Sequence, residues 1–180
     1  MSSEEREAYY QSDAYKKKTG WYMNTDPHCN HDFYHAQLNA TVRLTYHLTL
    51  IGGAGNDTYR MARGQGRDTI IEDDATAGNR DVVQFASGIT ADQLWFRQVG
   101  NNLEVSIIGT EDKLTLNSWY AGSQYHVEEF RTSDGHVLID TQVQNLVQAM
   151  ASFAPPAAGQ TTLPQAYQNS LAPLLAADWR

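Results

Sequence analysis

The stretch GGAGNDTYR at residues 52–60 decides the fold of this chain. It fits the nonapeptide pattern GGxGxDxUx at every fixed position, with Tyr59 as the large apolar residue U. Glycine adopts positive φ angles easily, so such a loop can turn its carbonyl oxygens inward, while Asp57 adds a carboxylate. Calcium prefers about six to eight oxygen ligands at about 2.3 to 2.6 Å. The stretch therefore suits a loop that binds calcium through oxygen atoms and leads into a short strand, with an ordinary glycine turn as the alternative.

Two less regular copies of the pattern follow. Residues 63–71, RGQGRDTII, keep the later glycines, the aspartate and the apolar position, but they begin with arginine. Residues 76–83, TAGNRDVV, keep mainly the aspartate and one apolar residue. Asp57 and Asp68 are eleven residues apart rather than nine, so the repeat is already irregular at its second copy.

Short apolar runs separated by turn residues follow the repeats. Strands are expected at residues 82–85, 94–99, 103–108, 113–116, 127–130 and 137–139. Turn sequences such as GNN at 100–102 and DG at 134–135 are typical of connections between adjacent antiparallel strands. An alternating apolar pattern at 38–50 predicts a further half-buried strand before the glycine-rich loop. These signals together indicate a mainly β chain with a small antiparallel meander.

The period of the apolar residues becomes helical after residue 140. Val143, Leu146, Val147 and Met150 fall on one side of a helix, which the consecutive prolines at 155–156 must end. A second amphipathic segment is expected at residues 163–179. Within residues 141–180 only Asp178 and Arg180 carry ionised side chains.

Residues 51–140 resemble the terminal repeats of RTX proteins joined to the haemolysin-type calcium-binding-related domain. The motifs that carry the resemblance are NDTY at 56–59, GRDTI at 66–70, GIT at 88–90 with LWF at 94–96, GNNL at 100–103, DKLTL at 112–116 with Trp119, and EEF at 128–130 with DG at 134–135. The C-terminal tail also resembles the end of such exported proteins.

This resemblance implies a fold and a cellular location for the protein. The expected architecture is mainly β: a short parallel β-roll fragment at residues 49–85, an antiparallel β cap at 86–140, and a helical C-terminal tail at 141–180. The resemblance further implies a secreted, toxin-related protein whose tail is a candidate secretion signal for a type I secretion transporter. Residues 1–48 match no recognised pattern and form an N-terminal segment of unknown role.

The resemblance also implies Ca²⁺ as the bound ion, shared by the loops of alternate nonapeptides. The expected ligand positions are Gly53, Gly55, Asp57, Gly64, Gly66, Asp68, Asn79 and Asp81. The acidic run at residues 72–74 is interpreted as a solvated loop, with a ligand role as the alternative. Residues 51–140 hold 14 acidic against 7 basic side chains, which favours a cation partner for this part of the chain.

Composition excludes several classes of protein. The net charge of -8 argues against nucleic-acid binding, which needs clustered lysine and arginine. Cys29 is the single cysteine, so no intramolecular disulfide forms. No apolar run approaches the length of a membrane span, and no apolar leader follows the acidic N-terminus. Nucleophile, zinc-protease and phosphate-loop motifs are absent, so a non-enzymatic module is expected.

Three alternatives stay open at the level of sequence. The chain could be the tail of a secreted cytolysin, protease or lipase that lacks its active domain. It could be an adhesin-like module that binds through aromatic residues such as Trp95 and Trp119, although a core role suits them better. Finally, His28, His31 and His35 have helical spacing and could hold zinc, although no second group of ligands accompanies them.

Overall fold

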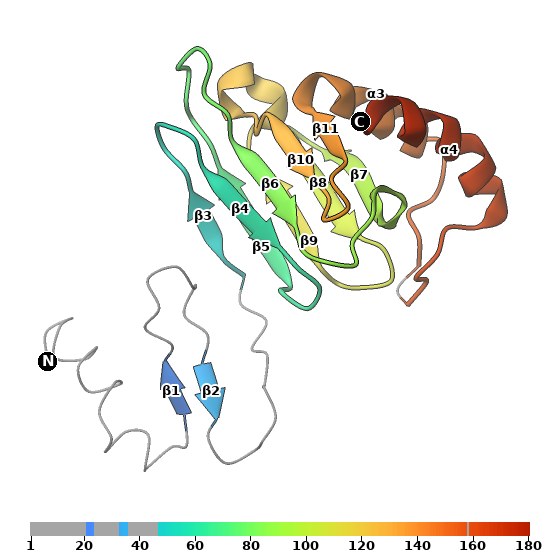
Figure 1. The fold of residues 1–180 in the computed structure, drawn as a ribbon, viewed down its shortest axis with the longest axis horizontal. Coiled ribbons are helices and arrows are strands. Elements are labelled where there is room, and N and C mark those ends of the chain that lie inside the picture. The colour runs from blue at the N-terminus through green and yellow to red at the C-terminus, as the bar shows by residue number, and fades with distance from the viewer. Residues whose placement is uncertain (1–20, 24–32, 36–46, 158) are drawn as a thin grey trace, which may run out of the picture. The chain divides into compact units, whose positions relative to one another are not determined.

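The computed structural model describes residues 21–23, 33–35, 47–157 and 159–180, which belong to two compact units, 1–45 and 46–180. In the first unit, β1 (Trp21–Met23) and β2 (Phe33–His35) pair in antiparallel fashion. His28, His31 and most of the alternating pattern at 38–50 lie outside the described residues, so they stay predictions. His35 lies in β2 and not in a helix, and the end of the pattern coincides with the start of β3 (Thr49–Ile51). The second unit contains the glycine-rich loop and everything that follows it (Figure 1).

Two sheets form the second unit. Their strands are β3 (Thr49–Ile51), β4 (Thr58–Met61), β5 (Arg67–Ile71), β6 (Val82–Phe85), β7 (Leu94–Val99), β8 (Asn102–Ile107), β9 (Lys113–Leu116), β10 (Glu129–Arg131) and β11 (Val137–Ile139). One sheet has the order β3-β5-β9-β8-β7, and the other has the order β11-β10-β6-β4. The mainly β prediction is therefore confirmed, and most predicted strands agree with the observed ones within two residues.

The chain alternates between the two sheets over the repeat region. β3 and β5 are parallel neighbours in one sheet, with Leu50 opposite Ile70, while β4 and β6 are parallel neighbours in the other, with Tyr59 opposite Val83. Each glycine-containing loop thus carries the chain from one sheet to the other. The loops between strands consequently gather at the two ends of the sheets.

The meander predicted for residues 82–139 is wrong in one respect. β7, β8 and β9 are antiparallel, as are β10 and β11, but β9 also pairs with β5, and β10 with β6, in parallel. The reason is the connection at 117–128, which contains two short 3-10 helices and takes the chain across to the second sheet. The later strands therefore extend both sheets of the repeat region.

Alternating side chains from both sheets fill one core. Leu103, Val105 and Ile107 of β8 are buried, whereas the residues between them are only partly covered. Phe96 and Phe130 meet edge to face across the core, with ring centroids 5.6 Å apart. Trp95 and Trp119 are each only 3% exposed, so they do not form a surface platform for a sugar.

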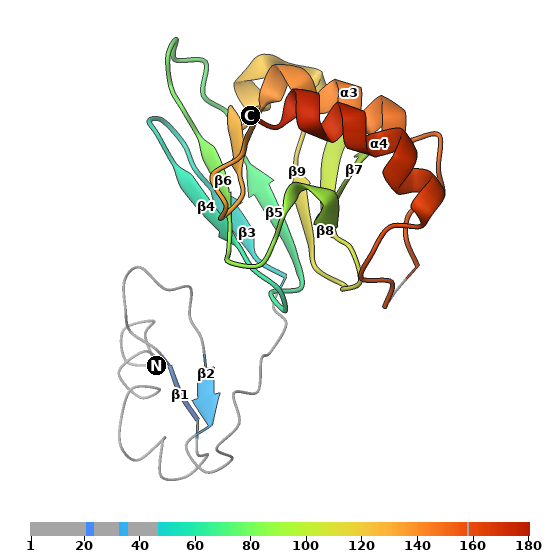
Figure 2. The same cartoon turned by 45° about the vertical axis from the view of Figure 1, so that its right-hand side comes forward.

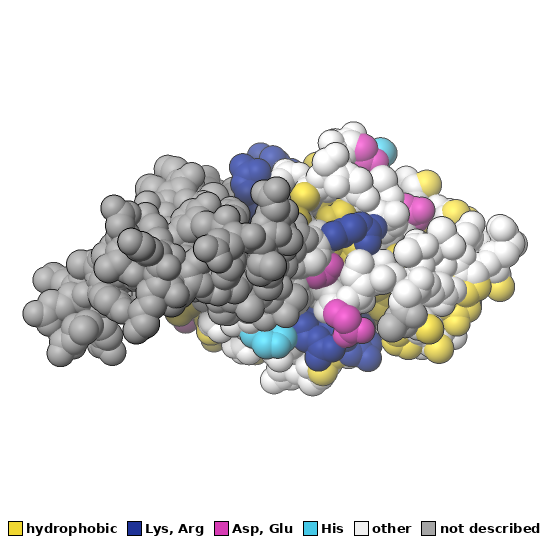
Figure 3. Space-filling view, turned by 90° about the horizontal axis from the view of Figure 1, so that it is seen from below, with side chains coloured by type: hydrophobic (Ala, Val, Ile, Leu, Met, Phe, Trp, Pro, Cys, Tyr) yellow, Lys and Arg dark blue, Asp and Glu magenta, His cyan; other side chains and the backbone are white. Residues whose placement is uncertain are grey.

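Two helices complete the unit on one side of the sheets (Figure 2). In α3 (Asp140–Met150), the four apolar residues predicted to share a face are all buried. α4 (Gln165–Asp178) packs beside α3 and presents mostly uncharged side chains, seen as yellow and white at the right of Figure 3. No helix of the described chain is both long and apolar enough to cross a membrane.

The C-terminal residues are held tightly against the sheets. Trp179 is 4% exposed and lies 6.4 Å from Phe96 between ring centroids. Arg180 exchanges backbone hydrogen bonds with Val137 in both directions, at 2.7 and 3.0 Å, so the chain ends beside β11 (Figure 1). In the folded protein the tail is therefore a packed part of the core and not a loose extension.

Replacing Trp179 by alanine should lower the free energy of unfolding by about 3 to 5 kcal/mol, because it removes a large buried side chain and leaves a cavity. Urea unfolding followed by far-ultraviolet circular dichroism measures this change. Arg180→Ala is the matched control, since its exposed side chain can be removed while the backbone bonds to Val137 stay. Equal unfolding midpoints for both variants would show that the tail does not contribute to the core.

Candidate metal centre

Three carboxylates meet where the glycine-rich loop approaches the next turn of the chain. Asp57 precedes β4, Glu72 follows β5, and Asp81 precedes β6. One carboxylate oxygen from each lies within 4.8 Å of the other two. The parallel pairing of β4 with β6 brings the first and third together, because it places Thr58 opposite Val82.

These carboxylates are buried and only partly hydrogen bonded. Asp81 is fully buried, Glu72 is 1% exposed, and Asp57 is half-buried. Asp57 Oδ2 and Glu72 Oε2 are buried oxygens without a hydrogen-bond partner. An unpartnered buried acceptor is costly, and a cation at this point would satisfy both oxygens. The geometry therefore fits a metal ion held by oxygen ligands.

The close approach of like charges changes the acidity of the group. Burial raises the pKa of Glu72 to about 7, and Asp81, Asp57 and Glu128 add to this effect, while a hydrogen bond from Tyr59 opposes it. Burial also raises the pKa of Asp81. Without a cation, a proton on Glu72 therefore relieves part of the repulsion.

Tyr59 connects the apolar position of the nonapeptide to this centre. Its hydroxyl donates a hydrogen bond to Glu72 Oε1. Burial, followed by the contact with Glu72, holds the pKa of Tyr59 far above its ordinary value, so the hydroxyl stays a donor. A Cβ on Gly52 would lie closer than 3.0 Å to both the Tyr59 hydroxyl and the Glu72 carboxylate. Glycine is therefore needed here for close approach.

Hydrogen bonds tie the surrounding loops to one another. Asp81 Oδ1 accepts the Asp57 N–H at 2.7 Å, and the Asp81 N–H donates to Glu128 Oε2 at 2.6 Å. The Gly55 N–H donates to Asp74 Oδ2 at 3.1 Å. Gly53 and Gly55 have φ angles of 90° and 119°, as the nonapeptide pattern requires. Asn79 lies beside the centre, with its side-chain amide 3.4 Å from Asp81 Oδ2.

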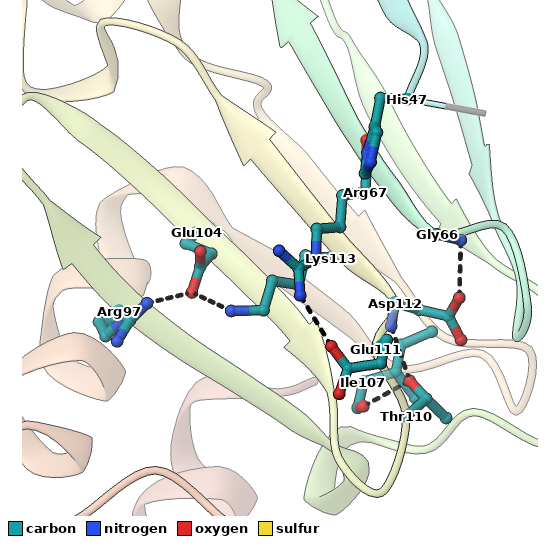
Figure 4. Close-up of polar contacts among 10 residues, drawn as sticks. All are labelled: His47, Gly66, Arg67, Arg97, Glu104, Ile107, Thr110, Glu111, Asp112 and Lys113. Carbon is teal, nitrogen blue, oxygen red and sulfur yellow. Dashed lines mark hydrogen bonds and ion pairs between the residues drawn. The ribbon is translucent and has the colours of Figure 1, made fainter. Parts of the chain in front are cut away.

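The other predicted ligands lie in a second group of loops. Asp68 Oδ1 accepts the Leu48 N–H at 3.0 Å, and Asp112 accepts the Gly64 N–H at 2.7 Å. Asp112 also accepts the Gly66 N–H at 2.8 Å, as Figure 4 shows. The structure thus brings Asp57 and Asp81 together and leaves Asp68 apart from them. The cause is the alternation between sheets, which puts Asp68 on β5 and in the five-stranded sheet.

Glu72 is the residue that sequence reasoning assigned to a solvated loop. The structure buries it, so this interpretation is wrong for Glu72, although Asp73 is exposed as expected. The alternation of buried and more exposed residues along β5 could have predicted the burial of Glu72. Asp68 and Ile70 face the core, and the same spacing of two carries Glu72 to the same side.

Comparison with known proteins finds a family match in the second half of the chain. Residues 102–142 match the family model described as haemolysin-type calcium binding protein related domain, which confirms that part of the predicted resemblance. The matched residues run from β8 into α3 and include Asp112 and Glu128. The nonapeptide region lies outside this match.

A particular relative is the iron-regulated protein FrpA of Neisseria meningitidis serogroup C. It is 36% identical to this chain over 94 residues, which amount to 51% of the chain. The same residues make up 8% of FrpA, so the chain corresponds to a small part of that protein.

Replacing Glu72 by glutamine should remove a pH dependence of stability in calcium-free buffer. In the folded wild-type protein the pKa of this carboxyl is about 7, against an ordinary value of 4.5. The stabilising contribution of the protonated carboxyl is therefore lost as the pH rises from 4.5 through 7. Glutamine cannot titrate, and the variant should avoid a loss on the order of 2 to 3 kcal/mol between pH 5 and pH 8. Urea unfolding at the two pH values measures the difference.

Asp73→Asn serves as the control for this experiment, because it removes one negative charge from the exposed neighbour of Glu72. It should retain the wild-type pH dependence. If both variants kept that dependence equally, Glu72 would not be the titrating group.

Proposed function

We propose that residues 47–180 form a calcium-stabilised C-terminal module of a secreted RTX-type protein, with structural rather than catalytic action. The observation that carries this proposal is the buried group of Asp57, Glu72 and Asp81, with two oxygens that lack a partner. It lies beside the one complete nonapeptide loop of the sequence. The description of the matched family, which names calcium binding, supports the same assignment.

The ligand chemistry favours calcium over other metals. Carboxylate oxygens are hard ligands that suit calcium, whereas zinc and copper prefer nitrogen or sulfur. Among the residues that the structure describes, no histidine or cysteine belongs to this group. Backbone carbonyls of the glycine-rich loop can supply further oxygens. Calcium would act here by neutralising repulsion and joining two successive turns of the chain, with no chemical step of its own.

The fold is best understood as a short β-roll. Successive strands of the repeat region alternate between the two sheets, and neighbouring repeat strands within each sheet pair in parallel, which supports this interpretation. β9 and β10 add to the same two sheets after a hairpin insertion. The antiparallel cap proposed for residues 86–140 therefore continues the two sheets of the roll fragment at 49–85.

Calcium should raise the thermal midpoint of the folded chain by a few degrees. Extracellular modules bind calcium with dissociation constants of about 10⁻⁴ to 10⁻³ M. Calcium at about ten times the dissociation constant then stabilises the folded state by about 1.4 kcal/mol. Melting curves in EGTA and in saturating calcium measure this shift. Glu72→Gln and Asp81→Asn should each remove most of it, because each takes a charged ligand from the centre.

Two controls sharpen the calcium experiment. Asp73→Asn should keep the full shift, because Asp73 is exposed. Asp112→Ala should lower stability by roughly 2 to 4 kcal/mol with and without calcium, since it leaves two glycine N–H groups unpaired outside the proposed centre. Coincident wild-type curves in EGTA and calcium would contradict the proposed function.

Secretion forms the second part of the proposal. We infer that residues 141–180 carry an uncleaved signal for a type I secretion transporter, and that the chain folds outside the cell where calcium is available. The resemblance of the tail to exported proteins and its nearly charge-free composition support this inference. Since the folded tail is packed against β7 and β11, the transporter must act on the chain before it folds.

A reporter fused to residues 141–180 should appear in the medium of a strain that contains a cognate type I transporter. A fusion to residues 101–140, of equal length, should stay inside the cell, because it lacks the proposed signal. Immunoblots of medium and cells measure the distribution. Retention of the first fusion, in a strain that exports a known RTX tail, would reject the signal and leave only the packing role.

A further inference from the structure

A small cavity lies on the outer face of the five-stranded sheet, apart from the carboxylate centre. Its volume is about 190 Å³. Charged side chains of β5, β7, β8 and β9 line one side, and the segment that joins α3 to α4 supplies Pro155 and Pro156 on the other. Such a cavity is smaller than the roughly 300 to 1,000 Å³ of drug-sized sites, so it suits a ligand with a single small ring.

The charges of this cavity do not balance. Arg97 and Lys113 both contact the same oxygen, Oε1, of Glu104, at 2.7 and 3.3 Å (Figure 4). Arg67 contacts Glu111 at 2.8 Å, and both of these side chains are more than half exposed. Three cationic groups therefore face two carboxylates. The lining carries one surplus positive charge in a chain whose net charge is -8.

Two of the cations lie side by side on neighbouring strands. Arg67 and Lys113 are opposite residues in the parallel pair of β5 and β9, so their side chains leave the sheet side by side. Like charges at opposite positions of neighbouring strands destabilise a sheet. Glu111 and Glu104 each contact one of these two cations, and an anionic group between the cations would add a second attractive contact to each.

From this geometry we propose that the cavity binds the carboxylate of a small organic ligand the size of one acidic sugar. A carboxylate carries one negative charge, which matches the surplus, and it accepts paired hydrogen bonds from a guanidinium group. A doubly charged phosphate would meet Glu104 and Glu111 with additional repulsion. The uncharged wall at Pro155 and Pro156 would contact the body of the ligand.

Titration of the full chain with glucuronate, followed by two-dimensional NMR at constant ionic strength and fixed free calcium, tests this proposal. Glucuronate should produce saturable shifts in β5, β8 and β9 with millimolar affinity, whereas neutral glucose should produce none. Arg67→Gln and Lys113→Gln should each weaken binding about tenfold. Arg60→Gln, which removes an exposed arginine from the other sheet, should leave the affinity unchanged.

Additional ligands and a further variant test the proline wall, the source of the sugar and the independence from the calcium centre separately. Acetate should bind more weakly than glucuronate, because it cannot reach the proline wall, and a short glucuronate polymer that binds more tightly would identify a polysaccharide as the source of the sugar. Glu72→Gln should leave glucuronate binding intact, which separates this cavity from the calcium centre. Absence of saturable shifts, equal response to glucose, equal affinity for acetate, or an Arg60→Gln effect as large as that of Arg67→Gln would overturn the assignment.

Discussion

A carboxylate at the start of one strand accepts the backbone N–H at the start of its parallel neighbour, and the rest of the module depends on this contact. The four pairs of acceptor and donor are Asp68 with Leu48, Asp81 with Asp57, Asp112 with Gly66, and Glu128 with Asp81. Each contact fixes the register of two strands that distant parts of the sequence supply. The aspartate of the nonapeptide thus acts in strand pairing as well as in cation binding.

The same contact creates an electrostatic difference between the two groups of loops. Both oxygens of Asp112 accept glycine N–H groups, so its charge is compensated within the backbone. In the Asp57 group, two oxygens lack such donors, and three carboxylates share one small volume. Only this group has both the surplus charge and the open ligand positions that a cation requires. The module is therefore asymmetric, with one group of loops suited to an ion and another closed by hydrogen bonds.

Sequence alone predicted much of the local structure. Turn residues and alternation located β6, β7, β9 and β11 within their observed bounds, and helical spacing identified the buried face of α3. The sheets that β9 and β10 join could not be predicted, because the parallel partner of each strand lies more than 40 residues away in the chain. The repeat predicted Asp57 and Asp81, whereas Glu72 was placed in a solvated loop, with a ligand role only as the alternative, because its neighbours are acidic too.

Those distant partners also set the order in which the module can fold. The β7–β8 hairpin forms from adjacent residues, whereas the pairing of β9 with β5 and of β10 with β6 closes a loop of more than 40 residues, which carries an entropic cost. β3 and β4, which hold the glycine-rich loop between them, pair with β5 and β6 across shorter loops, with separations of 20 and 24 residues. An ion bound there would therefore stabilise strand pairs that can form before β9 and β10 join the sheets.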